Sequence, residues 1–219
     1  MTHSVDPFKT ALQFTLKWEG GSGHPEDLAG KVDRGISQAT YDTYRRHQGL
    51  PEQFVSQMTE SELEDIYYRY YWQRCHAEVM CLPLSVVQFD TAVNFHVRGS
   101  IEFLQEALGV TVDGDFGPQT QAALAKQNNL ETAKRYCHGR MAYRQQRVKA
   151  NPSQEIFLQG WLRRDRDLLH CIEQLSLESV AEAPPIREVS RAPQVEIAGK
   201  LEQAIALLQE VVDLLKTPH

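Results

Sequence analysis

The sequence predicts a mainly α-helical protein, and three observations support this prediction. Apolar residues recur every three or four positions in most segments of the first 175 residues, a spacing that places them on one face of a helix. Residues that typically start helices precede several of these segments. The alternation of apolar and polar residues that marks strands is nearly absent. We therefore expect helices, with at most a short hairpin among them.

The first helix is expected at residues 6–19. Asp6 is suited to cap its start, and Pro7 to occupy its first position. Gly20 and Gly21 end it, because glycine commonly follows the last residue of a helix. Residues 22–37 then form a loop, an irregular β element or a short hairpin.

The remaining body helices follow from the same signals. Thr59 begins a capping box with Glu62, Pro83 starts another helix, and Ser100 is suited to cap a helix that closes at Gly109. The sequence DGDFGPQT (113–120) reads as a tight turn in which Gly117 permits a positive φ. Helices are expected at 38–47, 62–75, 84–97, 101–108, 121–127, 130–149 and 157–172.

The composition changes near Ser176. Residues 176–196 contain three prolines and no helical stripe, which indicates a linker. Residues 197–219 carry apolar side chains in a heptad-like pattern between positions 197 and 215. The pattern is short for a coiled coil. If exposed, this amphipathic helix would be too apolar for a monomer, so we expect it to pair with another copy in a homo-oligomer or to dock on a partner.

Composition excludes several functional classes. The net charge of -6 argues against nucleic acid as the main partner. No apolar run is long enough to span a membrane, and the N-terminus lacks a recognisable signal peptide, so we expect synthesis in the cytoplasm. The four cysteines lack the paired spacing of a zinc site, and we expect no metal and no cofactor.

The stretch LKWEGGSG (16–23) is the first candidate for chemistry. Glu19 lies on the same helix face as Phe8 and Leu12, and it ends the helix where the dipole is negative. Both features favour the protonated carboxylic acid, which glycoside hydrolysis requires as a proton donor. The alternative is a glutamate that simply ends a helix and reaches water.

Five segments carry a resemblance to a known family. WEGGSGHPEDLAGKVDRGISQATYDTY, IYYRYYW, FDTAVNF, VDGDFGPQT and GWLRR occur in order and resemble the glycoside hydrolase 108 family of N-acetylmuramidases. The likeness covers about residues 8–170. It implies a compact lysozyme-like helical body with a muramidase catalytic region at 1–95 and a predicted peptidoglycan-binding region at 96–175. Glu19 then takes the place of the family's catalytic glutamate.

The second catalytic group departs from the family pattern. The family usually has a threonine before its GIT motif, where this chain has Val32 or Asp33. Valine cannot hold a water molecule, whereas Asp33 can hold one or act as a base. Asp27 is the other candidate for positioning water or stabilising positive charge.

Four further residues are candidates for substrate contact. Asp90 and Asn94 share a helix face, and they either cap neighbouring loops or face the cleft. Trp18 and Trp72 either belong to the core or stack on sugar rings. In the same way, DGDFGPQT is either a turn alone or part of the cleft wall. The basic segment 134–149 is either a solvated face or a contact for anionic polymers.

The resemblance implies hydrolysis of the β-1,4 bond between N-acetylmuramic acid and N-acetylglucosamine in peptidoglycan, with Glu19 as general acid and action on the cell wall. Glycan strands are the expected partner. Two alternatives stay open: a non-catalytic peptidoglycan-binding protein on a degenerate muramidase scaffold, and a helical assembly protein that functions through its tail. The sequence does not distinguish a phage endolysin from a secretion helper or a housekeeping hydrolase.

Overall fold

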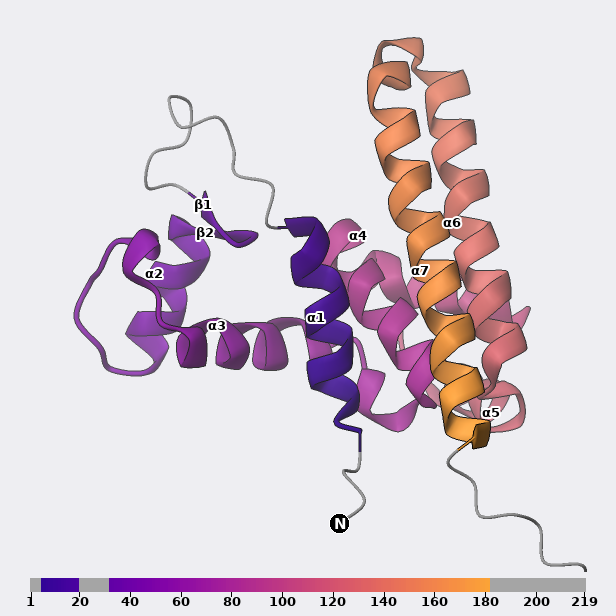
Figure 1. The fold of residues 1–219 in the computed structure, drawn as a ribbon, viewed down its shortest axis with the longest axis horizontal. Coiled ribbons are helices and arrows are strands. Elements are labelled where there is room, and N and C mark those ends of the chain that lie inside the picture. Colours follow the sequence, from indigo (N-terminus) through magenta and orange to yellow (C-terminus); the bar gives the residue numbers. More distant parts are fainter. Residues whose placement is uncertain (1–4, 20–31, 182–219) are drawn as a thin grey trace, which may run out of the picture. The chain divides into compact units, whose positions relative to one another are not determined.

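A computed structural model describes residues 5–19 and 32–181, and it confirms the mainly α prediction (Figure 1). Within the described part, the only sheet is a hairpin of two strands, each two residues long. The elements are α1 (Pro7–Glu19), β1 (Val32–Asp33), β2 (Ile36–Ser37), α2 (Gln38–His47), α3 (Glu60–Tyr67), α4 (Leu82–Leu108), α5 (Pro118–Gln127), α6 (Leu130–Ala150) and α7 (Glu155–Ala181). A π-helical turn, Tyr68–Trp72, extends α3, and short 3-10 turns lie at Val55–Gln57, Ala77–Val79 and Pro152–Gln154.

Local capping chemistry sets several helix starts. The Asp6 carboxylate accepts hydrogen bonds from the backbone N–H groups of Phe8 and Lys9, at 3.0 and 3.2 Å, as expected from the sequence. Thr59 and Glu62 form the full capping box at the start of α3. These bonds satisfy N–H groups that have no partner within the helix.

Two local expectations were wrong. Ser100 does not start a helix, because α4 runs from Leu82 to Leu108 and is interrupted earlier, at Phe95 and His96. Ser100 is buried in it, and its hydroxyl donates to the Val97 carbonyl at 2.7 Å. In the turn before α5, the glycine with positive φ is Gly114, at 76°, whereas Gly117 has a φ of -85°.

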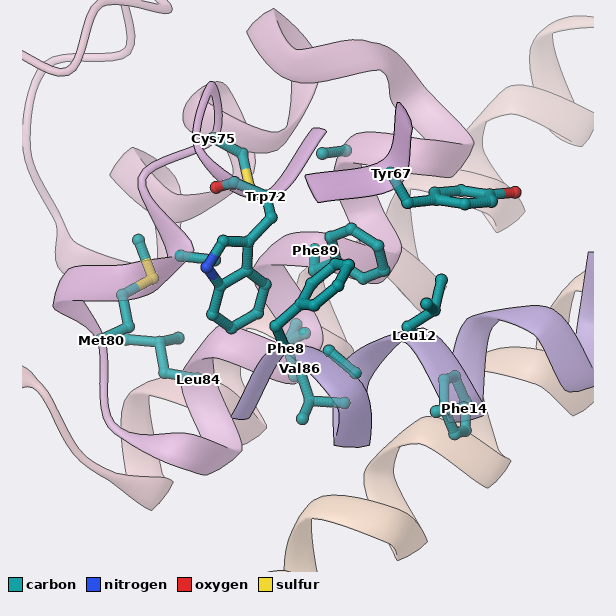
Figure 2. Packing of buried hydrophobic residues seen from close by; sticks show 14 of the residues in the cluster. Phe8, Leu12, Phe14, Tyr67, Trp72, Cys75, Met80, Leu84, Val86 and Phe89 are labelled. Atoms are coloured by element: carbon teal, nitrogen blue, oxygen red, sulfur yellow. Dashed lines mark hydrogen bonds between the residues drawn. The ribbon is translucent and has the colours of Figure 1, made fainter. Parts of the chain in front are cut away.

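The core lies where α1 packs against α4 and the end of α3. Phe8 from α1 meets Trp72 and Phe89 edge to face, with ring centroids 5.6 and 5.9 Å apart (Figure 2). Such edge-to-face pairs add to the stabilisation that apolar burial provides. This packing fixes the direction of α1, and therefore the position of Glu19 at its end.

Helices α6 and α7 form a long antiparallel pair (Figure 1). Lys134 and Glu173 form an ion pair of 3.1 Å between them, and Arg144 and Asp165 form another farther along. Helix α6 also packs on α4, where the Tyr136 hydroxyl donates to the Gln88 side chain and the Ser100 carbonyl. The second half of the chain therefore packs directly on α4.

The expected linker begins later than predicted, because α7 continues to Ala181. The rest of the linker and the expected helix at 197–219 lie outside the described residues. The described residues up to Glu178 form one compact unit. Within the described ranges, no helix combines the length and apolarity needed to cross a membrane.

Candidate active site

Glu19 is the last residue of α1, and its side chain keeps 22% of its surface exposed. Its Oε1 atom accepts a hydrogen bond of 2.7 Å from Nη1 of Arg164, which lies on α7. The sequence argument considered only the apolar helix face and the helix dipole, and it missed this arginine. The guanidinium places a positive charge against the Glu19 carboxylate.

The hairpin turn touches Glu19 directly. Gly35 has a φ of 81°, and a Cβ atom there would lie 2.6 Å from the Tyr67 hydroxyl oxygen and 3.3 Å from Cβ and Cγ of Glu19. The Tyr67 hydroxyl donates to the Arg34 carbonyl at 2.8 Å. Only glycine fits this position without displacing its neighbours.

Two tyrosines flank the same carboxylate. Burial raises the pKa of Tyr67 and of Tyr71, and the negative charge of Glu19 raises both further. Their rings lie 5.4 Å apart between centroids. Both phenols therefore stay neutral beside Glu19 at ordinary pH, and Tyr67 donates its proton to the Arg34 carbonyl.

Behind Glu19 lies a buried network of alternating charges that joins four helices. Asp90 is fully buried and accepts from Arg164 at 2.7 Å and from Arg140 at 2.9 Å. Burial opposes ionisation of Asp90, but the two arginines outweigh it, so the pKa of Asp90 lies below its usual value. Through the network the charges run in the order Glu19, Arg164, Asp90, Arg140, Asp165 and Arg144.

The placement of Asp90 corrects the expectation of a substrate contact. A carboxylate without exposed surface and with two arginine partners has no face left for a glycan. Asn94 is partly buried, and its side-chain amide donates to the Asp90 carbonyl at 3.0 Å. Asp90 and Asn94 lie near the candidate site, but Asp90 contributes to it through its bond with Arg164.

The two tryptophans differ. Trp72 is only 4% exposed and packs against Phe8 and Phe89, so it is a core residue and offers no platform for a sugar ring. Trp18 is partly buried and packs against the edge of the core.

Asp33 lies at the base of the hairpin turn that touches Glu19. Its Oδ2 atom accepts from Nε and Nη2 of Arg34, at 3.1 and 2.9 Å. Arg34 also binds the Glu60 carboxylate at 2.6 Å and the Met58 carbonyl at 2.9 Å. Asp33 is therefore held by an anchored arginine. Asp27 lies outside the described residues.

A cavity of about 490 Å³ opens next to Tyr71. Tyr71 connects it to the Glu19 site, because this tyrosine lines the cavity and is also within reach of the Glu19 charge. His96, at the break in α4, has a φ of 64°, which is uncommon for a non-glycine residue. The lining includes cationic and aromatic groups and contains no acid: Thr43, His47, Tyr70, Tyr71, Arg74, His96, Val97 and Arg98.

Sequence reasoning missed Arg164, Tyr67, Tyr71 and Gly35 as parts of this site. The signal was present, since Arg164 ends the GWLRR segment and both tyrosines lie in IYYRYYW. Across residues 5–19 and 32–181, no three histidine, cysteine or acidic side chains are grouped as a metal site would require.

Two family models match this chain. Residues 12–95 match the family described as Glycosyl hydrolase 108, and residues 99–166 match the one described as Predicted Peptidoglycan domain. The boundary between the two matched ranges lies at the break in α4, next to Phe95 and His96. No curated protein matches the chain.

Among solved structures, "Structure of Brucella abortus SagA" is similar in fold. The TM-score is 0.61 at 24% sequence identity, over 76% of this chain and 94% of that chain.

Proposed function

We propose, from the premise that this chain belongs to the glycosyl hydrolase 108 family and carries a predicted peptidoglycan domain, that it hydrolyses the β-1,4 bond between N-acetylmuramic acid and N-acetylglucosamine. The two matches support hydrolysis of peptidoglycan. The single observation that supports the catalytic assignment is the partly exposed Glu19 carboxylate, enclosed by Arg164, Gly35 and two neutral tyrosines.

Glu19 acts as the general acid. It donates its proton to the glycosidic oxygen as the bond from C1 of N-acetylmuramic acid to that oxygen breaks. A water molecule adds its oxygen to C1, and its proton leaves to a base. The products are one new reducing end and one new hydroxyl group.

The second group is Asp33 or Asp27. Asp33 is supported by its place in the turn that contacts Glu19. Its two bonds from Arg34 both use Oδ2, so they do not occupy Oδ1. Asp27 remains a candidate from the sequence.

The cavity beside Tyr71 receives part of the glycan strand. Its aromatic rings and cationic side chains suit sugar faces and the acidic substituents of muramic acid. Asn94 and Trp18 remain proposed contacts. Pairing through the 197–215 stripe, synthesis in the cytoplasm and action on the cell wall remain predictions from the sequence.

One observation favours a second candidate function, a non-catalytic peptidoglycan-binding protein. Val32 or Asp33 stands where the family has a threonine; Val32 is 46% exposed and cannot hold a water molecule, and Asp33 is already held by Arg34. Such a protein would sediment with wall sacculi without cleaving them.

The test compares Glu19→Gln with the wild type. The amide keeps the size of the side chain but cannot donate a carboxylic proton, and general acids contribute about 100- to 10,000-fold to rate. We expect release of reducing ends from purified sacculi to fall by about that factor. Glu131→Gln is the matched control, because the Glu131 side chain is 74% exposed at the start of α6.

Melting temperature verifies that both variants are folded. A folded Glu19→Gln protein that keeps more than about a tenth of wild-type activity would refute the general-acid role. Binding to sacculi without any release by the wild type would favour the second candidate.

A further inference from the structure

We propose that Arg164, which the predicted peptidoglycan domain supplies, is a positioning residue that fixes which oxygen of Glu19 carries the transferable proton. This inference rests on the proposed function. The second region would then complete the active site of the first as well as hold the wall.

The guanidinium of Arg164 is oriented by bonds on both sides. Its Nε and Nη2 atoms donate to Oδ1 of Asp90, at 3.3 and 2.7 Å, and its Nη1 atom donates to Oε1 of Glu19, at 2.7 Å. A planar guanidinium with three directed bonds cannot rotate without breaking them. It therefore presents one fixed donor to Glu19.

The Asp90 carboxylate that orients Arg164 is itself fixed. Arg140 donates to its Oδ2 at 2.9 Å, and Asp165 accepts from the other end of Arg140 at 2.7 Å. Thr15 donates to Oδ1 of Asp90 at 3.2 Å. Thr15 lies one turn before Glu19 on α1. The last turn of this helix and Arg164 are therefore both held by Asp90.

This arrangement has a chemical consequence. A guanidinium has only donors, so the Oε1 atom that it contacts must accept. The proton of the carboxylic acid then resides on Oε2, which is free of this contact. After proton transfer, the positive charge of Arg164 stabilises the carboxylate that remains.

Removing Arg164 changes the charges that face Glu19. Asp90, on α4, would lose one of its two arginine partners and keep only Arg140, so more of its negative charge would face Glu19. From the end of α3, Tyr67 and Tyr71 face it as neutral phenols, and the hairpin presents Gly35. Both the lost positive charge of Arg164 and the less compensated charge of buried Asp90 favour the protonated acid. The alkaline limb of the pH–rate profile should therefore move to higher pH.

The experiment measures kcat and KM against pH on soluble glycan strands for Arg164→Gln, Arg164→Lys and Asp165→Asn, with Arg163→Gln as the control from the exposed neighbour. For Arg164→Gln we expect kcat to fall about 100-fold, as misplacement of a reacting group does. The alkaline limb should move up by about one pH unit. Arg164→Lys keeps the charge, so it should keep the limb while losing part of kcat.

Asp165→Asn separates positioning from folding. It removes the charge that pairs with Arg140 and Arg144, while Arg164 keeps its own bonds to Asp90 and Glu19, so it should lower the melting temperature and leave the alkaline limb in place. Should Arg164→Gln fold but keep both kcat and the limb, the inference fails. It also fails if Asp165→Asn and Arg164→Gln change the profile alike, since Arg164 would then act only on stability.

These outcomes are distinct from failure of the proposed function. In that case the Glu19→Gln protein itself would remain active. If Glu19→Gln is inactive and the Arg164 variants have a wild-type profile, only the positioning role is refuted.

Discussion

Gly35 has a positive φ and also has no room for a side chain. Comparing Gly35→Ala with Gly49→Ala separates these two effects. Gly35→Ala meets an unfavourable positive φ and also a clash with the Tyr67 hydroxyl next to Glu19. Gly49→Ala meets a similar φ, 66°, with no atom within 4 Å of the new Cβ. Strain of this kind costs about 1–3 kcal/mol.

We expect both alanine variants to lose stability in chemical unfolding and only Gly35→Ala to lose activity. Its kcat should fall at least tenfold, because the clash displaces Tyr67 or Glu19 by fractions of an ångström or more. Equal activity of the two folded variants would show that the hairpin turn does not shape the site.

For single residues, the sequence predicts Glu19 as the candidate catalytic residue but does not predict which residues surround it. Its place at the end of an amphipathic helix and before two glycines is a local pattern. The contact with Arg164 joins residues 145 positions apart, and it depends on how α7 packs against α1. Asp90 and Trp72 show the same limit, because spacing gives the helix face of a residue but not what covers that face.

Helices α1, α4, α6 and α7 meet at the buried charges, and Asp90 is the link between them. Asp90→Asn removes a charge from between two arginines, and breaking a buried ion pair costs about 3–5 kcal/mol. We expect a loss of this size in the free energy of unfolding near neutral pH. Asp167→Asn is the control, since Asp167 pairs with Lys17 at the surface, where such pairs contribute about 0–1 kcal/mol.

The acid dependence tests the same link. The pKa of Asp90 is lowered in the folded state, so its contribution to stability is present above the unfolded value of about 3.9 and is lost as the pH falls below it. Between about pH 4 and pH 2, the wild type should therefore lose more stability than Asp90→Asn does. Parallel unfolding curves over this range would contradict a lowered pKa.

Helix starts were predictable where a side chain acts on its own backbone, as Asp6 and Thr59 do. A break was expected near Ser100, between the helices predicted at 84–97 and 101–108, but the structure has it at Phe95 and His96, which carry no helix-breaking signal of their own. Its position is set by packing, with Phe95 in edge-to-face contact with Phe103 and Tyr143. A π-helical turn after α3 was likewise invisible in the apolar spacing.

At the scale of the molecule, two family regions share one core and one charge network. Asp90 and Glu19 lie within the match to the hydrolase family, whereas Arg140, Arg164 and Asp165 lie within the match to the peptidoglycan domain. The domain label alone suggests separable catalysis and binding. The buried ion pairs of Asp90 with Arg140 and Arg164 join the two regions in one core.

The identity of the new chain end tests the central claim most directly. Sacculi digested with the wild-type protein are reduced with borohydride, and the products are separated and identified by mass spectrometry. Hydrolysis at the proposed bond predicts that the reduced sugar is N-acetylmuramitol, absent in the Glu19→Gln digest. Reduced N-acetylglucosamine at the new ends, or 1,6-anhydro ends that resist reduction, would contradict the account.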